Sequence, residues 1–164
     1  MISNFVGSFP FANPSELDGY LRDLASVAKK ILIVDDSPVI RETVRFSLER
    51  HFDWQVCGEA VNGLDALHKA QESHPDIVVL DLSMPVMDGL KAARHLRQTM
   101  PSVSIVMFTS HDSPQLRHEA TAAGIPKVVS KDSPLGTLTD AIEELLQPEA
   151  PGSDPSESPQ AQQA

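Results

Sequence analysis

Residues that could bind a metal ion or handle a phosphoryl group follow four separate apolar runs of this 164-residue sequence. After successive runs stand Asp35-Asp36, Asp81, Thr109 and Lys131. Carboxylates can bind hard cations or attack phosphorus, and a hydroxyl and an ammonium can hold phosphoryl oxygens. If the fold brings these side chains together, the residue types predict phosphoryl transfer onto a carboxylate.

The apolar runs have the length and composition of buried strands. Three of them are rich in β-branched residues and two are weaker candidates: 31–34, 77–80 and 103–108, then 54–57 and 127–129. Between them, Ile40, Val44 and Leu48 form a helical stripe behind Ser37-Pro38, a typical helix start. Further helices are expected over about 63–73, 88–98, 112–123 and 134–147.

The alternation of five strands with five helices predicts an α/β fold, a doubly wound five-stranded parallel sheet of the flavodoxin-like type. We expect the strand order 2-1-3-4-5, numbered along the chain. Ligands bind beyond the carboxyl ends of strands in such a sheet, so the candidate side chains would share one edge. Taken singly, these residues could be helix caps, loop carboxylates or surface lysines, but their joint placement favours a site.

Three clustered carboxylates would repel one another, because two unit charges about 4 Å apart interact by about 4 kcal/mol at an effective dielectric constant of about 20. Lys131 alone cannot offset that repulsion. Oxygen ligands without a nearby cysteine or histidine pair select a hard cation, so we expect Mg²⁺. Asp81 has the central position for nucleophilic attack, and Asp35 and Asp36 would serve the metal. Lys131 and Thr109 would each bind a phosphoryl oxygen.

These residues also carry a resemblance to a known family. The sequence reads Asp35-Asp36, then Asp81-Leu82-Ser83-Met84-Pro85-Val86-Met87-Asp88-Gly89, then Thr109-Ser110, then Val129-Ser130-Lys131. In these motifs it resembles the CheY-like receiver domain of two-component response regulators. The resemblance runs from about Lys29 to Gln147, which is most of the chain.

The resemblance implies that Asp81 accepts a phosphoryl group from a sensor histidine kinase or a histidine phosphotransfer protein. It also implies that Asp36, Asp81 and the backbone carbonyl of Ser83 bind Mg²⁺ directly, while Asp35 acts through water. The family's switch and phosphate-binding residues correspond to Thr109 and Lys131. Beyond its own phosphorylation and dephosphorylation such a domain is not an enzyme, and it signals through a downstream protein that the sequence does not identify.

Some features depart from many receivers. Val128 stands three residues before the lysine, where many receivers carry an aromatic ring that turns inward on activation. Lys131-Asp132-Ser133 resembles receivers that precede helix-turn-helix output domains, but none follows in this sequence, so we expect a stand-alone receiver. His111 and Ser83 each stand two residues after a site residue, at positions that border the path of the attacking water in the family. They could tune the lifetime of the acyl phosphate, or His111 could be a bystander residue on the surface. Gly89 is expected to permit a tight turn into the next helix.

Composition narrows the range of partners. The formal net charge of −10, from 23 acidic and 13 basic residues, disfavours direct binding of DNA or RNA. The sequence has neither a basic and apolar secretory start nor an apolar run long enough to span a membrane. We therefore expect a cytoplasmic protein without membrane contact.

Two terminal segments flank the receiver-like region 29–147. Residues 1–28 predict a short amphipathic helix, packed on the receiver, a second copy or a partner. Ser15 and Asp18 have the spacing of a capping box, so Ser15 is the expected cap, and the apolar stripe that follows is Leu17, Tyr20, Leu21 and Leu24. Residues 148–164 are rich in Pro, Ser and Gln and lack large apolar residues, which predicts a disordered tail.

Three other functions fit parts of the pattern. The protein could pass its phosphoryl group onward as a phosphorelay intermediate. An Asp-nucleophile phosphatase could use a similar sheet, but it needs a second aspartate two residues after the nucleophile, where Ser83 stands. A flavodoxin-like cofactor carrier would need a phosphate-cradling loop after the first strand, where Asp35 and Asp36 would repel phosphate.

Overall fold

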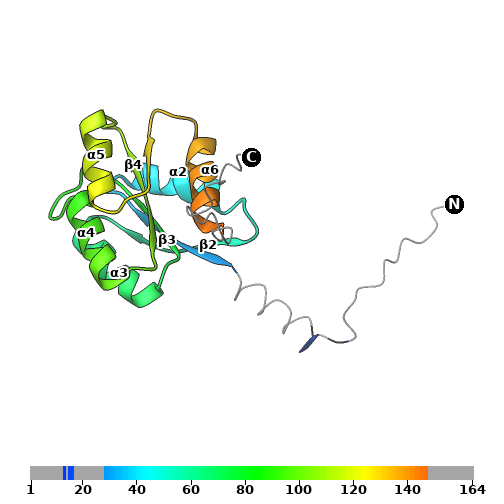
Figure 1. The fold of residues 1–164 in the computed structure, drawn as a ribbon. Coiled ribbons are helices and arrows are strands. Elements are labelled where there is room, and N and C mark those ends of the chain that lie inside the picture. Colours follow the sequence, from blue (N-terminus) through cyan, green and yellow to red (C-terminus); the bar gives the residue numbers. More distant parts are fainter. Residues whose placement is uncertain (1–12, 14, 17–27, 148–164) are drawn as a thin grey trace, which may run out of the picture.

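The computed structural model of the protein describes residues 13, 15–16 and 28–147 (Figure 1). From Lys29 onward, strands and helices alternate as the hydrophobic pattern predicts. The predicted helix over 15–24 falls mostly outside the described residues, as does the predicted disordered tail. Of that helix's start, the structure shows that the side chain of Asn13 accepts hydrogen bonds from the Ser15 hydroxyl and the Glu16 amide. The capping side chain is therefore Asn13, two residues before the predicted Ser15.

The described strands form one parallel sheet. They are β1 (Lys29–Val34), β2 (Trp54–Ala60), β3 (Ile77–Leu80), β4 (Ser104–Thr109) and β5 (Lys127–Ser130). Their spatial order is β2-β1-β3-β4-β5, which confirms the predicted order. All four residues of β3 are buried, as expected for a central strand covered on both faces.

Strand β2 is longer than predicted. Val56 pairs with Ile31, but Gly58 rather than Cys57 pairs with Leu32. Cys57 is thus the extra residue of a bulge, which lets pairing continue to Ala60. A glycine and a glutamate at 58 and 59 interrupt the apolar pattern, and this is why the sequence alone ended the strand at residue 57.

The helices lie between the strands and begin close to the predicted residues. They are α2 (Pro38–Leu48), α3 (Gly63–Ser73), α4 (Gly89–Thr99), α5 (Pro114–Ala122) and α6 (Leu135–Leu146). All but α6 start with a side chain that accepts a hydrogen bond from an amide of the first turn: Ser37, Asn62, Asp88 and Ser113. These caps satisfy amides that have no partner inside the helix.

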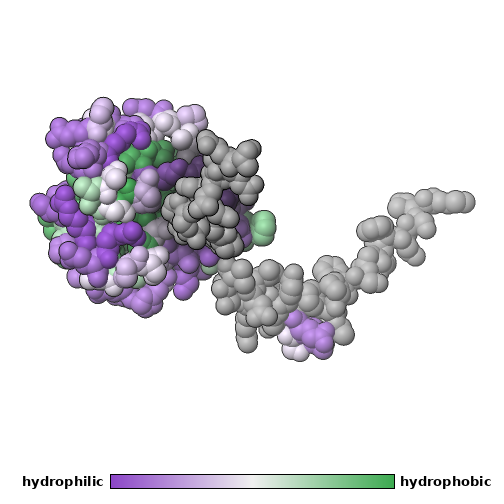
Figure 2. All heavy atoms as spheres, in the orientation of Figure 1, coloured by the Kyte–Doolittle hydropathy of each residue, from purple (hydrophilic) through white to green (hydrophobic). Residues whose placement is uncertain are grey.

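The helices cover both faces of the sheet, as Figure 1 shows. Helices α3, α4 and α5 pack on one face, in a cluster with Leu32, Leu80 and Met107. Helices α2 and α6 pack on the other face, around Ile33 and Val79. In Figure 2, hydrophilic residues cover most of the visible described surface, and hydrophobic residues show mainly between the helices. No helix in the described part of the chain is long and apolar enough to cross a membrane.

The beginning and the end of the described domain lie together. Lys29, at the start of β1, and Gln147, just after α6, line one hollow with Trp54 and Leu146. His51 stacks on Trp54 beside this hollow, with ring centroids 4.0 Å apart. Because β1 begins here, the hollow lies at the end of the sheet opposite the carboxyl ends of the strands.

Candidate functional site

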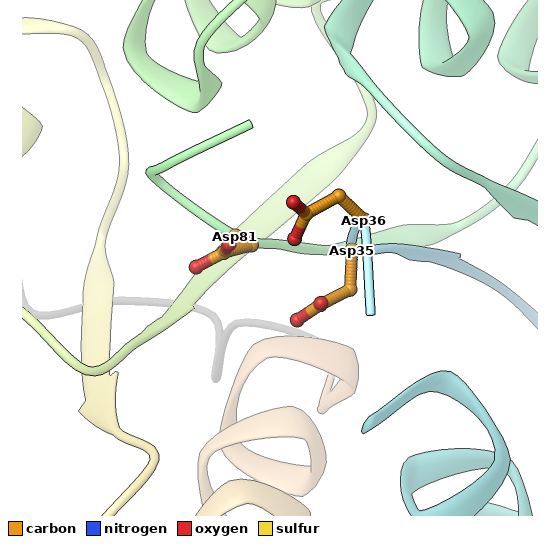
Figure 3. Close-up of side chains that lie close together, drawn as sticks. All are labelled: Asp35, Asp36 and Asp81. Carbon is orange, nitrogen blue, oxygen red and sulfur yellow. The ribbon is translucent and has the colours of Figure 1, made fainter. Parts of the chain in front are cut away.

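Three carboxylates meet at the carboxyl edge of the sheet. Asp35 and Asp36 follow β1 and Asp81 follows β3, and one oxygen from each lies within 4.8 Å of the others (Figure 3). Asp35 is 2% exposed and Asp81 is 5% exposed, whereas Asp36 is exposed to solvent. The two central, adjacent strands thus deliver two buried carboxylates and one accessible carboxylate to the same point.

The ammonium of Lys131 bridges two of these carboxylates. Its Nζ lies 2.6 Å from Oδ2 of Asp35 and 3.1 Å from Oδ1 of Asp81. The backbone amide of Lys131 donates to the carbonyl oxygen of Thr109 at 2.9 Å, which fixes where the chain leaves β5. Only 13% of the lysine side chain is exposed, so its charge acts in a largely desolvated setting.

Burial and charge act in opposite directions on these groups. Burial raises the pKa of the Asp81 carboxyl, Asp35 adds to this, and the attraction of Lys131 lowers it only in part. Burial also lowers the pKa of Lys131, but its hydrogen bonds and charge interactions with Asp35 and Asp81 outweigh this, so its pKa is raised. Lys131 therefore stays charged at neutral pH.

The donor set fits a hard divalent cation. The clustered ligand atoms are all carboxylate oxygens, and the Lys131 ammonium contacts two of the three carboxylates. Oxygen ligands of this kind suit Mg²⁺ rather than zinc or copper. Asp36 and Asp81 offer oxygens to such an ion, while both oxygens of Asp35 already accept hydrogen bonds, from Ser37 and Lys131. The role of the Ser83 carbonyl as a ligand stays a prediction.

Thr109 ends the neighbouring strand β4, and it is fully buried. Its Oγ1 accepts a hydrogen bond from the His111 amide at 3.1 Å, which leaves the hydroxyl proton free to be donated. His111 is exposed and lines a hollow with Leu82, the residue that follows Asp81. Val128 is half-buried and packs against the core cluster beneath α3, α4 and α5.

The loop after β3 shows why a glycine stands at 89. Gly89 does not have the left-handed backbone expected of a tight-turn glycine; in this loop that conformation belongs to Val86, at φ 68°. A Cβ on Gly89 would instead lie 2.1 Å from the carbonyl oxygen of Asp81. The glycine is therefore required by close backbone approach and not by a left-handed conformation of its own.

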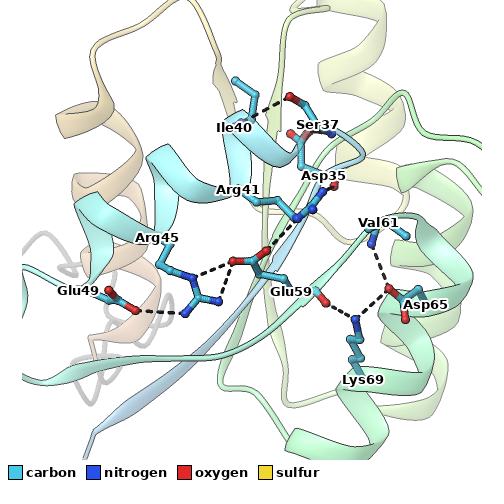
Figure 4. A network of polar contacts seen from close by, with 10 residues as sticks. All are labelled: Asp35, Ser37, Ile40, Arg41, Arg45, Glu49, Glu59, Val61, Asp65 and Lys69. Carbon is cyan, nitrogen blue, oxygen red and sulfur yellow. Dashed lines mark hydrogen bonds and ion pairs between the residues drawn. The ribbon is translucent and has the colours of Figure 1, made fainter.

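The acidic turn after β1 is held on several sides, as Figure 4 shows. Oδ1 of Asp35 accepts from the Ser37 amide at 2.9 Å, and the Asp35 amide donates to the Ala60 carbonyl at 3.1 Å. The Asp35 carbonyl accepts from Nη1 of Arg41 at 2.8 Å, and Arg41 also pairs with Glu59. Sequence reasoning missed Arg41 and Glu59; a lone glutamate near the carboxyl end of a strand is the signal that could have found them.

The structure thus brings together Asp35, Asp36, Asp81 and Lys131 and places Thr109 at the end of the next strand. His51 lies at the opposite end of the sheet, against Trp54. Such an arrangement can bind a divalent cation, present a carboxylate nucleophile and offer an ammonium to an anion.

Comparison with known proteins supplies the family. The model of the response regulator receiver domain matches residues 31–143. The uncharacterized transcriptional regulatory protein YhcZ of Bacillus subtilis is 39% identical over 104 residues, which cover 63% of this chain and 49% of YhcZ. The chemotaxis protein CheY of Halobacterium salinarum is 32% identical over 120 residues, covering 73% of this chain and 98% of CheY.

A solved structure shows the same fold. The two-component response regulator of the LuxR family from Aurantimonas sp. SI85-9A1 superposes with a TM-score of 0.69 and 36% identity, over 72% of this chain and 84% of that one. The chain spans about half the length of YhcZ and 59% of the response regulator VraR of Staphylococcus epidermidis.

Proposed function

The chain belongs to the response regulator receiver domain family, and we propose that it accepts a phosphoryl group on Asp81 from a phosphohistidine-bearing protein. Receiver domains are signalling domains rather than conventional enzymes, and they interact with histidine kinases. The observation that carries the assignment is the position of Asp81, buried, in contact with Lys131 and clustered with Asp35 and Asp36.

The chemistry follows from the side chains themselves. A lone pair on an Asp81 carboxylate oxygen forms the new P–O bond, while the P–N bond of the donor breaks and its electron pair stays on the imidazole nitrogen. Lys131 holds negative charge on a phosphoryl oxygen, and it needs little movement to do so because it already contacts Asp81 at 3.1 Å. The Thr109 hydroxyl donates a hydrogen bond to a second phosphoryl oxygen.

Receiver domains bind Mg²⁺ at an acidic pocket. We assign direct binding here to Asp36, Asp81 and the Ser83 carbonyl, and we expect Asp35 to contact the ion through water. The bound cation would supply positive charge against both the carboxylates and the incoming phosphoryl group. The tie between Asp35 and Lys131 supports an indirect role for Asp35, because its Oδ2 is already occupied at 2.6 Å.

The surroundings of the site support a protein as the phosphoryl donor. Six large hydrophobic residues are exposed in the described part of the chain, and four follow the carboxyl ends of β1, β2 or β3: Val39, Val61, Leu64 and Val86. Exposed apolar side chains at this edge of the sheet favour contact with a folded protein surface over a small charged metabolite.

We propose that the output is a phosphorylation-dependent contact with a second protein, or onward transfer of the phosphoryl group. The net charge of −10 disfavours nucleic acid as the direct partner of this chain. YhcZ carries the name of a transcriptional regulatory protein, but 63% of this chain matches only about half of it, so its activity as a whole is not transferred.

The test is phosphorylation of the full chain by acetyl phosphate or phosphoramidate with Mg²⁺, read as a mass increase of one phosphoryl group. Asp81→Asn should abolish the increase, and Asp88→Asn, which changes another aspartate of the same loop, should retain it. Labelling of Asp81→Asn at the wild-type level would overturn the assignment of the acceptor. Absence of labelling in the wild-type protein would overturn the function.

A further inference from the structure

We propose that Arg41 is a positioning residue for the metal site, an inference that rests on the function proposed above. Its side chain is only 14% exposed, so it is held in place by the protein. Nε donates to Oε2 of Glu59 at 2.9 Å, and Nη1 donates to the carbonyl oxygen of Asp35 at 2.8 Å (Figure 4). The planar guanidinium thus joins the acidic turn after β1 to strand β2.

The carbonyl that Arg41 contacts controls the direction of Asp36. The carbonyl of Asp35 and the amide of Asp36 belong to one planar peptide unit, so a hydrogen bond to that carbonyl restrains the orientation of both. Asp36 is exposed, and in the described part of the chain no protein group donates a hydrogen bond to its carboxylate. The direction of the Asp36 side chain therefore depends on its backbone, and Arg41 holds that backbone.

Glu59 sets the direction of Arg41 and also provides a matched control. Its carboxylate lies between two arginines. Oε2 accepts from Arg41, and Oε1 accepts from Nε of Arg45 at 2.8 Å and lies 2.7 Å from Nη2 of Arg45. Arg45 therefore makes an ion pair with the same glutamate and lies on the same helix. It makes no contact with Asp35; its other partner is Glu49, at 3.1 Å.

Positioning and simple charge repulsion predict opposite effects on metal affinity. Removing a positive charge beside a cation site should strengthen Mg²⁺ binding, and this should hold for Arg41 and, more weakly, for Arg45. Loss of positioning should weaken Mg²⁺ binding, and only at Arg41. Hydrogen-bond partners of metal ligands typically contribute roughly 10–100-fold in affinity, so a contact one peptide unit away should contribute roughly threefold to tenfold.

The experiment is a calorimetric Mg²⁺ titration of the full chain as wild type, Arg41→Gln and Arg45→Gln. We expect Kd to rise roughly threefold to tenfold in Arg41→Gln and to stay within about 1.5-fold of wild type in Arg45→Gln. Thermal unfolding in EDTA should show a loss of stability for both variants, because each loses an ion pair to Glu59. Arg41→Lys, which keeps the charge but not the two-pronged contact, should give an intermediate Kd.

Wild-type affinity in Arg41→Gln, or an equal rise of Kd in both arginine variants, would overturn the positioning role. If Arg41→Gln does not fold, the comparison passes to Arg41→Lys, and an unchanged Kd there overturns the role in the same way. Asp36→Asn distinguishes failure of the proposed metal site from failure of the proposed role of Arg41. If wild type binds Mg²⁺ and Asp36→Asn does not, the metal site stands whatever Arg41 does; if wild type binds none, both proposals fall.

Discussion

A Cβ atom placed on Gly89 would lie 2.1 Å from the backbone carbonyl oxygen of Asp81. The Gly89 amide also donates to the carbonyl oxygen of Leu82, the residue that follows Asp81, at 2.9 Å. The first residue of α4 is therefore packed directly on the backbone of the proposed phosphoacceptor. A displacement of the start of α4 toward β3 would therefore push against the backbone of Asp81.

Gly89→Ala should lower the free energy of unfolding by about 1–3 kcal/mol, as overpacking of a closed contact does. The gain in helix propensity, about 1 kcal/mol, is too small to reverse this, because the clash is with backbone that has no alternative rotamer. Gly136→Ala is the matched control, since a Cβ there would meet no atom within 4 Å apart from its chain neighbours and the backbone of its own helix. It should be neutral or stabilising in urea denaturation, and wild-type stability of Gly89→Ala would refute the close approach.

Asp36→Asn should remove the stabilisation that Mg²⁺ gives while leaving the metal-free fold intact. Its carboxylate is exposed and crowded by two others, so its loss should leave stability in EDTA unchanged or raise it by up to about 1 kcal/mol. Asp35→Asn should instead weaken the metal-free protein, because Lys131 loses a partner at 2.6 Å. Urea denaturation with EDTA and with excess Mg²⁺ measures both, and an equal Mg²⁺ response in wild type and Asp36→Asn would contradict the assignment.

Thr109→Ala should still be phosphorylated but should lose the structural response. Asp81, Lys131 and the acidic pair remain in this variant, while the hydroxyl that we expect to contact the phosphoryl group is gone. Without a differential contact a ligand shifts no equilibrium, so the loop after β4 should stay in its resting state. Hydrogen exchange over residues 108–134, with and without beryllofluoride and Mg²⁺, follows this directly.

Thr109→Ser keeps the hydroxyl and serves as the control for that experiment. It should show the wild-type change in exchange, since its Oγ can accept from the His111 amide as Thr109 does at 3.1 Å and can donate its proton. A full wild-type response in Thr109→Ala would mean that coupling runs through a different contact.

Glu59 should contribute stability that depends on pH. Burial opposes its ionisation, but hydrogen bonds from Arg45 and Arg41 outweigh this and lower the pKa of Glu59. A carboxyl whose pKa is lower in the folded state stabilises the protein above its unfolded pKa, about 4.3, and loses that contribution as the pH falls through the folded value. Glu59→Gln should therefore be less stable than wild type by about 1–2 kcal/mol at pH 7.

The difference between wild type and Glu59→Gln should shrink progressively below about pH 4.3, because the wild-type carboxyl becomes protonated. Urea denaturation of both proteins at several pH values from neutral to acidic measures it. Glu49→Gln is the control, since Glu49 is more exposed and pairs with Arg45 alone. A difference between wild type and Glu59→Gln that stays constant over that range would show that the Arg41 and Arg45 contacts do not depend on the charge.

The sequence predicted the sheet well because its central strands are continuous apolar runs. All four residues of β3 are buried, and a continuous apolar run of this kind indicates a strand inside a sheet that is covered on both faces. It failed at β2, where Gly58 and Glu59 break the pattern and the bulge at Cys57 shifts the register. A register shift depends on pairing with β1, and such pairing is not encoded in the periodicity of one strand.

The candidate site was predictable where chemistry coincides with strand ends, as at Asp81 and Lys131. It was not predictable where a contact depends on side-chain reach across elements, as between Arg41 and the Asp35 carbonyl at 2.8 Å. Gly89 illustrates the same limit, because its glycine is explained by a neighbouring backbone and not by its own φ. Roles assigned from the resemblance, such as the Ser83 carbonyl, stay predictions.

Lys29 and Gln147 line the same hollow, at the end of the sheet away from Asp81. A domain whose two junctions are neighbours can be circularly permuted through a short linker, with new ends opened in a distant surface loop. It can equally be inserted into a loop of a second protein, because the host chain would leave and return at nearly one point and little closure entropy would be lost. In either arrangement the edge of the sheet that carries Asp81, the proposed phosphoacceptor, would face away from the host protein.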